Sequence, residues 1–290
     1  MADQDIIFKF RSKEYTQKDL DYISQVIAQN FEQGRVYISR ILAQNWDWRQ
    51  PNGKIKDFAV RDTLLRMEEA GLIKLPPPKI RNNNNAQKPL QVPLFDNTPL
   101  EGSIKDFPGL SVHQATGNSK IIWKYLLHRY HYLGYPRVVG AHLCQVAMLG
   151  EQVVGCLAWA SPAWKIAPRD QFVGWDENTR RRNLYLVVSN VRFLIPPWIK
   201  IKHLASKLLS LSIKSLGPEW QRLYGHPVHL AETFVDVSRF SGTTYKAANW
   251  IYLGQTKGSA KKGNSYNFHG AKKAIYVYPL HNKFRRWLNS

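Results

Sequence analysis

The sequence predicts an α+β protein with two domains: a small N-terminal domain of the winged helix-turn-helix type and a larger C-terminal domain built on a mixed β-sheet. Two observations lead to this prediction. Apolar residues recur at helical spacing through residues 16–75, with polar turns between the segments. From residue 106 onward, helical segments alternate with short runs rich in β-branched and aromatic residues. With 290 residues, 44% of them apolar, the chain is long enough for both domains.

The N-terminal domain, expected over residues 1–78, contains three predicted helices. Thr16 and Asp19 have the spacing of a capping box, in which each side chain accepts a hydrogen bond from a backbone N–H at the helix start. A second helix is predicted by VYISRILAQNW (36–46) and a third by KDFAVRDTLLRMEEAG (56–71). The three helices are the framework that a winged-helix domain requires.

A short strand at Leu72–Leu75 completes the winged-helix prediction as the wing. Arg61 and Arg66 lie on the third predicted helix, where they are candidates for contact with phosphates or base edges in a major groove. The first 78 residues carry 12 basic and 11 acidic side chains, however. This near balance leaves a protein-interaction role open beside DNA binding.

Residues 79–105 are rich in Asn and Pro and lack periodicity, which predicts a linker or an extended strap. The C-terminal domain is expected over residues 106–290. Its first predicted elements are a helix at 119–132 and two strands, 142–149 and 153–161, joined by a tight turn.

The later elements of this domain follow from their apolar patterns. Residues 183–195 are almost continuously apolar, which favours a central strand, and 202–217 is an amphipathic helix. Residues 228–254 predict a strand that contains two acids, then a short helix with Tyr245 and Trp250 five residues apart, then a returning strand. The alternation of strands and helices predicts a mixed sheet.

The net charge of +20 is concentrated in the C-terminal part of the chain. Residues 79–290 hold 29 of the 41 basic and 10 of the 21 acidic residues, a net charge of +19. The last 37 residues contain eight basic residues, no acid and several interleaved aromatic residues. Such a surface attracts phosphate backbones and offers flat faces to unpaired bases, so DNA is the expected partner. A generic solvated basic surface is the alternative.

The candidate nucleic-acid contacts in this part are basic side chains from five segments of the chain. They are Arg180, Arg181, Arg182, Arg192, Lys200, Lys202, Lys257, Lys261, Lys262, Lys272 and Lys273.

The sequence contains no run of 18 apolar residues, and its first residues lack the layout of a secretion signal. Cys144 and Cys156 lie in apolar runs, where small buried thiols are favoured over a disulfide. We therefore expect a cytoplasmic protein with no membrane association.

The order of elements and the run YKAANW (245–250) resemble the GCN5-related acetyltransferase fold, in which a tyrosine on a short helix precedes an aromatic residue entering the next strand. Members of that family cradle the pyrophosphate of acetyl-CoA in a glycine-rich loop at a helix N-terminus. The corresponding junction here, PPWIKIKHLAS (196–206), contains no glycine. Side chains there obstruct a close backbone approach, so acetyl-CoA is not the expected cofactor.

Longer strings resemble a more specific family over nearly the whole chain: HYLGYPRVVGAHL (131–143), RDQFVGWDENTRRRNLYLVVSNVRFLI (169–195) and ETFVDVSRFSGTTYKAANWIYLGQTKG (232–258). They resemble the DruA family of the Druantia anti-phage defence systems, whose domain also accompanies some transposases. The resemblance implies a DNA-directed role in phage defence or mobile-element biology, with partners such as a helicase. It does not imply a particular reaction.

Five of the ten carboxylates in residues 79–290 fall in two motifs, Asp170/Asp176/Glu177 and Glu232/Asp236. Glu232 and Asp236 are an even number of residues apart, so on one strand they share a face. With Asp176 on a neighbouring element they would form a site for Mg²⁺ or Mn²⁺ that activates water against a phosphodiester. The alternative is that these acids neutralise nearby arginines in structural ion pairs.

Three further side-chain sets have chemical interpretations. Tyr245 is a candidate nucleophile or general acid, or else packs its helix onto the sheet. Asn190 and Arg192 are expected to face the same side as Glu232, where arginine suits a bidentate grip on phosphate. His128 and His131 have a spacing that permits metal ligation, but surface histidines on a helix are the simpler interpretation.

The leading hypothesis is thus a DNA-binding defence protein with metal-dependent cleavage or nicking of DNA. A non-catalytic recognition module that recruits a helicase or nuclease, or acts with a transposase, is the second. An acyltransferase is the third.

Overall fold

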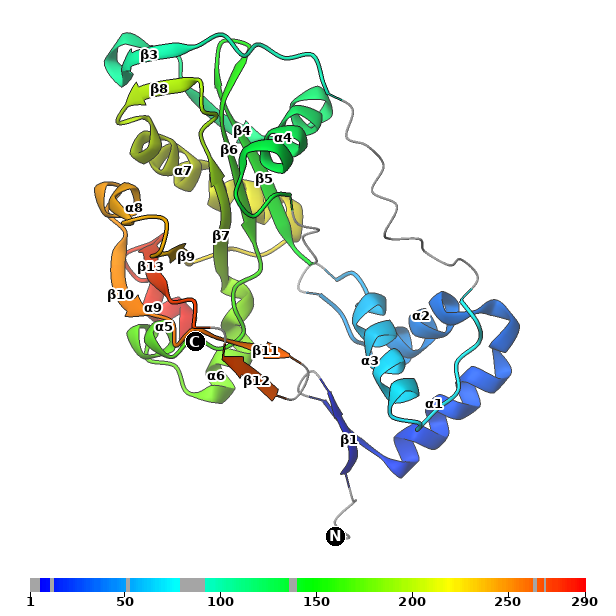
Figure 1. Ribbon diagram of the computed structural model, residues 1–290. Helices are drawn as coiled ribbons and strands as arrows, with labels where there is room; N and C mark the ends of the chain where they lie inside the picture. The colour runs from blue at the N-terminus through cyan, green and yellow to red at the C-terminus, as the bar shows by residue number, and fades with distance from the viewer. Residues whose placement is uncertain are drawn as a thin grey trace. The chain divides into compact units, whose positions relative to one another are not determined.

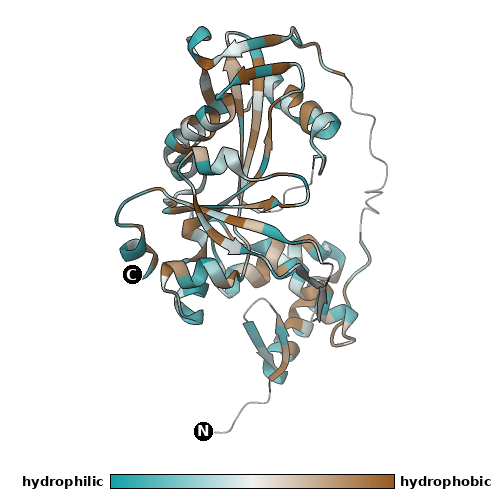
Figure 2. Ribbon diagram, turned by 60° about the vertical axis from the view of Figure 1, so that its left-hand side comes forward, coloured by the Kyte–Doolittle hydropathy of each residue, from teal (hydrophilic) through white to brown (hydrophobic). Residues whose placement is uncertain are grey.

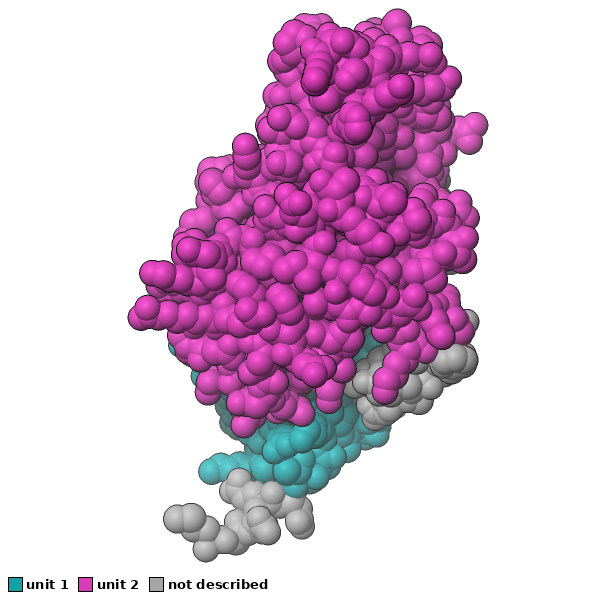
Figure 3. Space-filling model, turned by 90° about the vertical axis from the view of Figure 1, so that its left-hand side faces the viewer, with its two compact units in different colours: residues 1–88 teal, residues 89–290 magenta. Residues whose placement is uncertain are grey.

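The computed structural model describes residues 6–10, 13–50, 53–78, 92–135, 140–262, 265–268 and 270–290, and within them not the side chains of 259–262 and 265–268. The chain divides into two compact units, residues 1–88 and 89–290, which are coloured separately in Figure 3. The division falls inside the Asn- and Pro-rich stretch 79–105. Each unit is described by itself.

Unit 1 consists of a hairpin and three helices. The hairpin is formed by β1 (Ile6–Phe10) and β2 (Lys13–Thr16), which pair antiparallel. The helices are α1 (Gln17–Gln29), α2 (Arg35–Asn45) and α3 (Asp57–Glu69), and a 3₁₀ turn, η1 (Phe31–Gln33), precedes α2. All three predicted helices are therefore present. The apolar faces of the helices pack on one another around Ile23, Ile38 and Met67.

The helix start predicted at Thr16 is confirmed. The Thr16 hydroxyl accepts a hydrogen bond from the Asp19 N–H, and the Asp19 carboxylate accepts one from the Thr16 N–H at 2.8 Å. The predicted wing is wrong, because Leu72–Leu75 is not a strand. The Leu75 N–H donates instead to the Glu68 carboxylate at 3.0 Å. The described part of unit 1 thus has a hairpin before its helices and no strand after them.

Unit 2 is built on a seven-stranded mixed sheet in the order β10-β13-β9-β7-β6-β5-β4 (Figure 1). Its strands are β4 (Ser111–Gln114), β5 (His142–Leu149), β6 (Gln152–Ala160), β7 (Val187–Leu194), β9 (Leu230–Asp236), β10 (Ile251–Gln255) and β13 (Lys273–Pro279). Neighbours pair antiparallel except β7 and β9, which are parallel. β7 is the fourth strand of the seven, so the prediction of a central strand is confirmed, although residues 184–186 form a 3₁₀ turn, η3.

Helices cover both faces of this sheet. α4 (Gly117–Tyr130) packs on the face that includes Cys156 and Ala158, and α7 (Leu204–Tyr224) packs on the face that includes Trp159. Figure 2 shows apolar residues concentrated along the strands between the helices. The shorter helices are α5 (Ala167–Val173), α6 (Glu177–Asn183), α8 (Thr243–Ala247) and α9 (Phe284–Leu288). Cys144 and Cys156 are buried and free, as expected.

Two smaller strand pairs complete unit 2. β3 (Leu100–Ser103) pairs parallel with β8 (Ile199–Lys202), and a 3₁₀ turn, η2 (Ile104–Asp106), follows β3. β11 (Ser259–Lys262) and β12 (Ser265–Phe268) form an antiparallel pair. Within the described ranges, no helix combines the length and the apolar content needed to cross a membrane.

The two neighbouring central strands, β7 and β9, separate after their first four paired residues. β7 and β9 pair over Val187–Asn190 and Leu230–Thr233, after which β7 continues beside β6 alone and β9 continues beside β13. A bulge lies in the same part of β7, because Asn190 is opposite Trp159 whereas Arg192 is opposite the adjacent Ala158. Since a bulge reverses the alternation of faces, Arg192 is placed on the α4 side of the sheet and Asn190 on the α7 side.

Candidate nucleic-acid interface

Glu232 lies at the centre of a buried network of charges. Its Oε2 accepts a hydrogen bond from Arg169 Nη1 at 2.9 Å, and its Oε1 accepts one from the Ala163 N–H at 2.8 Å. Both the Glu232 and the Arg169 side chains are fully buried. Arg169 also bonds Asp170 at 2.7 Å, and Asp170 lies 3.4 Å from the guanidinium of Arg180. Two acids and two arginines thus compensate one another inside unit 2.

This arrangement decides between the two interpretations of Glu232. Burial raises the pKa of the Glu232 carboxyl, and the charge of Arg169 opposes that shift. Each carboxylate oxygen already accepts a hydrogen bond from within the fold. The ion-pair interpretation holds for Glu232, and its partner in the pair is Arg169.

Asp176 and Asp236 also have local structural roles. Asp176 caps α6, accepting hydrogen bonds from the Thr179 N–H at 2.8 Å and the Thr179 hydroxyl at 3.1 Å, and the backbone bond lowers the pKa of Asp176. Asp236 ends β9 and accepts bonds from the Ser238 hydroxyl at 2.7 Å and its N–H at 3.1 Å, which lower the pKa of Asp236.

The expected metal site is therefore not formed by Asp176, Glu232 and Asp236. Among the described residues, no three His, Cys, Asp or Glu side chains are grouped closely enough to hold a metal ion, and this includes His128 and His131. The even spacing of Glu232 and Asp236 does place them on one face of β9. Glu232 is buried in an ion pair, however, whereas Asp236 is half-buried at the end of the strand.

The prediction that Asn190 faces the same side of the sheet as Glu232 is wrong, because of the register between β7 and β9. Ser189 is opposite Glu232 and Asn190 is opposite Thr233, so Asn190 and Glu232 lie on opposite faces. Asn190 meets Tyr245 instead: the Tyr245 hydroxyl donates to Asn190 Oδ1 at 2.8 Å. Burial raises the pKa of Tyr245 to about 12. A phenol in this environment is a poor nucleophile at neutral pH, and its ring packs α8 onto the sheet.

Arg192 lies on the opposite face of the sheet from Asn190, because the bulge reverses the alternation of side chains. Its guanidinium donates to the backbone carbonyls of Gly134 at 3.1 Å and of Val191. No described carboxylate lies within 4 Å of it, so the Arg192 charge is uncompensated by an ion pair. The prediction that Arg192 is available to a phosphate stays a prediction.

Aromatic rings gather beside Arg192, where the chain leaves α4 and where it leaves β9. The Tyr132 and Phe240 ring centroids are 5.5 Å apart, and the His131 ring stacks on Tyr132 at 4.9 Å. The guanidinium of Arg239 lies 4.7 Å from the Tyr132 ring centroid. We refer to His131, Tyr132, Arg239 and Phe240 as the Tyr132 cluster. No local pattern in the sequence brings these residues together, because Tyr132 and Phe240 lie in segments that are far apart in the chain.

His131 is held neutral in this cluster. Burial and the charge of Arg192 lower the pKa of His131 from 6.5 to about 4, and its Nδ1 accepts a hydrogen bond from the Leu133 N–H at 3.2 Å. The unfolded chain takes up a proton here below pH 6.5, whereas the folded chain does so only near pH 4. Between these values the unfolded state binds more protons, so stability falls as the pH falls.

We expect the His131→Asn variant to lose part of this pH dependence. Wild-type stability should fall by about 1–2 kcal/mol more than that of the variant between pH 7 and pH 4, since solvent screens part of the shift at this half-buried ring. Urea unfolding at both pH values measures the difference. His128→Asn, an exposed position on α4, is the control and should follow the wild type. Parallel curves for wild type and His131→Asn would contradict the proposed neutral state.

The predicted basic contacts divide into engaged and available side chains. On α3, Arg61 lies 3.4 Å from Asp57 and Arg66 lies 2.6 Å from Glu69. In unit 2, Arg180 is buried against Asp170, and Arg181 and Lys200 pair with acids at 2.6 Å and 2.8 Å. The available side chains are exposed and have no described carboxylate within 4 Å. They are Arg182, Lys202, Lys257 and Lys272.

The basic C-terminal segment is part of the sheet. Its strand β13 lies between β9 and β10, with Ile275 and Val277 fully buried. Lys273 is at the start of β13, opposite Asp236. The side chains of Lys261 and Lys262 lie outside the described residues. The segment therefore has a structural role in the core of unit 2, and only its exposed lysines and arginines remain candidate contacts.

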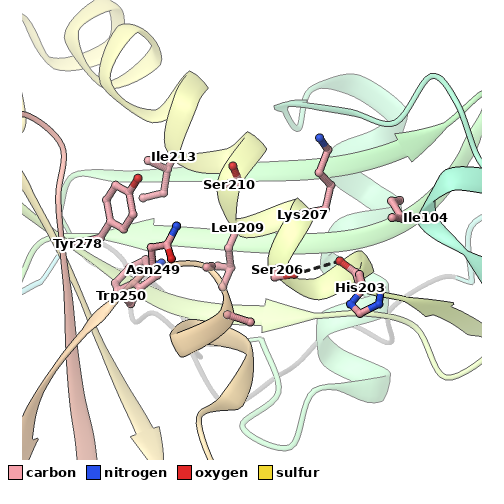
Figure 4. A pocket seen from close by; sticks show the side chains of 12 residues that line it. Ile104, His203, Ser206, Lys207, Leu209, Ser210, Ile213, Asn249, Trp250 and Tyr278 are labelled. Carbon is pink, nitrogen blue, oxygen red and sulfur yellow. Dashed lines mark hydrogen bonds between the residues drawn. The ribbon is translucent and has the colours of Figure 1, made fainter.

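A pocket of about 280 Å³ lies beside the N-terminal half of α7 (Figure 4). Its polar side chains include His203, Lys207 and Asn249, and Trp250 and Tyr278 form its apolar end. The junction before α7, predicted from its lack of glycine to be unsuited to acetyl-CoA, forms β8 and pairs with β3. The backbone of this junction is thus engaged in a ladder of hydrogen bonds.

Comparisons with known proteins give one family and a set of distant structural similarities. The coenzyme A complex of aminoglycoside acetyltransferase AAC(6')-Ib is 13% identical, with a TM-score of 0.40, covering 63% of this chain and all of that one. NAA60 of Arabidopsis thaliana, solved with acetyl-CoA, is 12% identical, with a TM-score of 0.42, covering 59% of this chain and 98% of that one. Similarities of this degree assign neither an activity nor a ligand.

Among curated proteins, none matches the chain. The model of the family described as Druantia protein DruA matches residues 67–267, which is more than half of the chain. The matched range includes the whole buried charge network, the Tyr132 cluster and the central strands. The chain therefore belongs to the DruA family of Druantia proteins.

Proposed function

We propose that this protein is the DNA-binding component of a Druantia-type anti-phage defence system, and that it recruits a helicase or nuclease to DNA. Membership of the DruA family supports the defence role. Cleavage through Asp176, Glu232 and Asp236 is not part of the proposal, because the hydrogen bonds of these carboxylates are made within the fold.

The observation that supports the proposal is which charged side chains of residues 79–290 are paired within the fold and which are not. Nine of the ten carboxylates accept a hydrogen bond or form an ion pair within the fold. Among the described basic side chains of unit 2, only Arg169, Arg180, Arg181 and Lys200 pair with a carboxylate. The remaining described cations form no ion pair within 4 Å, and a polyphosphate chain supplies counterions for them.

The test is DNA binding by fluorescence anisotropy at a series of salt concentrations. With six to ten phosphate contacts, the affinity should fall roughly 10³- to 10⁵-fold between 50 and 200 mM salt. Lys272→Ala should weaken binding and reduce the salt slope by about one, since the Lys272 charge is free for a phosphate. Lys200→Ala is the matched control and should change the slope less, because Glu101 already neutralises Lys200.

Two outcomes would contradict the proposal. A salt-independent affinity would remove its electrostatic basis, as would no detectable binding to single-stranded or duplex DNA at 50 mM salt. The same samples, incubated with supercoiled plasmid and Mg²⁺ or Mn²⁺, test the recruitment hypothesis. Nicking that survives the Glu232→Gln substitution would show a cleavage site elsewhere in the chain and overturn the purely recruiting role.

A further inference from the structure

The Tyr132 cluster exposes part of two aromatic rings in a cationic surrounding. Tyr132 retains 39% and Phe240 retains 49% of their surface exposed, although both are large apolar rings. They come from segments that are far apart in the sequence, one following α4 and the other following β9, and meet at 5.5 Å. Solvent-exposed rings held against one another in this way form a surface on which a third planar group can stack.

The charges around these rings favour an anionic ligand. Arg239 covers one part of Tyr132 at 4.7 Å, and Arg192 lies close enough to influence the ionisation of both His131 and Tyr132. Neither arginine forms an ion pair with a described carboxylate. Asp236, the acid nearest to the cluster, uses its Oδ1 to bind the Ser238 hydroxyl and N–H.

We propose that the Tyr132 cluster binds unpaired bases of DNA, with Tyr132 and Phe240 stacking on the bases and Arg192 and Arg239 contacting the adjacent phosphates. The proposal rests on the proposed DNA-binding function and specifies its substrate as DNA with unpaired bases. Aromatic stacking accepts any base, because every base has a π-face, and arginines beside the rings track the backbone. Bases within a duplex are already stacked on their neighbours, so this surface discriminates against fully paired DNA.

The location of the cluster supports a role in ligand binding over a role in packing. It lies where β7 and β9 stop pairing and where a bulge turns Arg192 toward the α4 side. Bulges recur where a strand re-aims a side chain toward a functional surface. The rings contribute little to the core, since the buried residues of unit 2 are held by other clusters on both faces of the sheet.

The experiment compares single-stranded and duplex DNA that carry 2-aminopurine, a fluorescent base whose emission is quenched by stacking. Tyr132→Ala should lower single-strand affinity roughly ten-fold or more and abolish the quenching, while duplex affinity changes less than about two-fold. Phe240→Ala should act in the same direction. Tyr132→Phe keeps the ring and should bind as the wild type does.

Control variants distinguish the loss of stacking at the Tyr132 cluster from a general loss of DNA binding or of the fold. Tyr185→Ala removes an exposed aromatic ring that contacts His226 away from the cluster, and should leave both affinities unchanged. Equal losses for single-stranded and duplex DNA, or no loss with Tyr132→Ala, would overturn the stacking proposal. In either case salt-dependent binding by the wild type would leave the DNA-binding function standing. Thermal unfolding of each variant verifies that the fold is intact.

Discussion

Replacing Glu232 with alanine should lower the free energy of unfolding by about 3–5 kcal/mol, the cost of removing one partner of a buried charge pair. Arg169 is fully buried, and Glu232 is the acid that faces its Nη1 at 2.9 Å. The substitution also removes the acceptor of the Ala163 N–H. Urea unfolding followed by tryptophan fluorescence measures the change, and the unfolding midpoint should shift to lower urea with an unchanged slope.

A matched control distinguishes a buried pair from an exposed one. Glu177→Ala removes the partner of Arg181, in a pair whose side chains are 52% and 39% exposed. Exposed pairs contribute at most about 1 kcal/mol, so this variant should remain close to the wild type. A Glu232→Ala variant as stable as Glu177→Ala would mean that Asp170, together with water, is enough to compensate the Arg169 charge. The network would then not be the rigid support that its burial implies.

Replacing Gly242 with alanine should also destabilise unit 2, by about 2–5 kcal/mol from overpacking and backbone strain together. Gly242 has φ = +72°, and a β-carbon there would lie 2.8 Å from Tyr276 Cζ. Tyr276 cannot withdraw, because its ring is almost completely buried and stacks on Tyr245 at 5.8 Å. Thermal unfolding should show the loss, and the hydrogen bond from Tyr245 to Asn190 should be disturbed with it.

The Gly174→Ala variant separates the effect of backbone strain from the effect of overpacking. Gly174 has φ = +87°, but a β-carbon there would meet no atom within 4 Å. This variant should therefore carry only the backbone strain, about 1–2 kcal/mol. Equal destabilisation by the two variants would show that the contact between Gly242 and Tyr276 is not tight.

The elements that could be predicted from sequence are those with a strong local signal. The three helices of unit 1 follow from periodicity and from the capping box at Thr16, and the central position of β7 follows from a strand that is apolar on both faces. These signals are contained in neighbouring residues, so no knowledge of distant contacts is needed to interpret them.

The arrangement of the candidate site depends on register, which the sequence does not specify. Even spacing correctly put Glu232 and Asp236 on one face, but which side chains oppose them is decided by pairing across strands. The bulge beside Arg192 reverses a face without any glycine or proline to indicate it. Arg169 was overlooked because its partner is 63 residues away in the chain.

The position of β13 has a consequence for how the protein acquires its structure during synthesis. β9 and β10 are made first, yet each pairs with β13 and not with the other. From residue 236 to residue 279 is about 40 residues, so at about 5–20 residues per second the ribosome leaves this edge of the sheet open for roughly 2–8 s. During that interval the backbone N–H and C=O groups along one edge of β9 have no strand to pair with. Residues that keep the nascent chain from associating with its neighbours are therefore valuable here, and the surplus of positive charge provides the necessary repulsion.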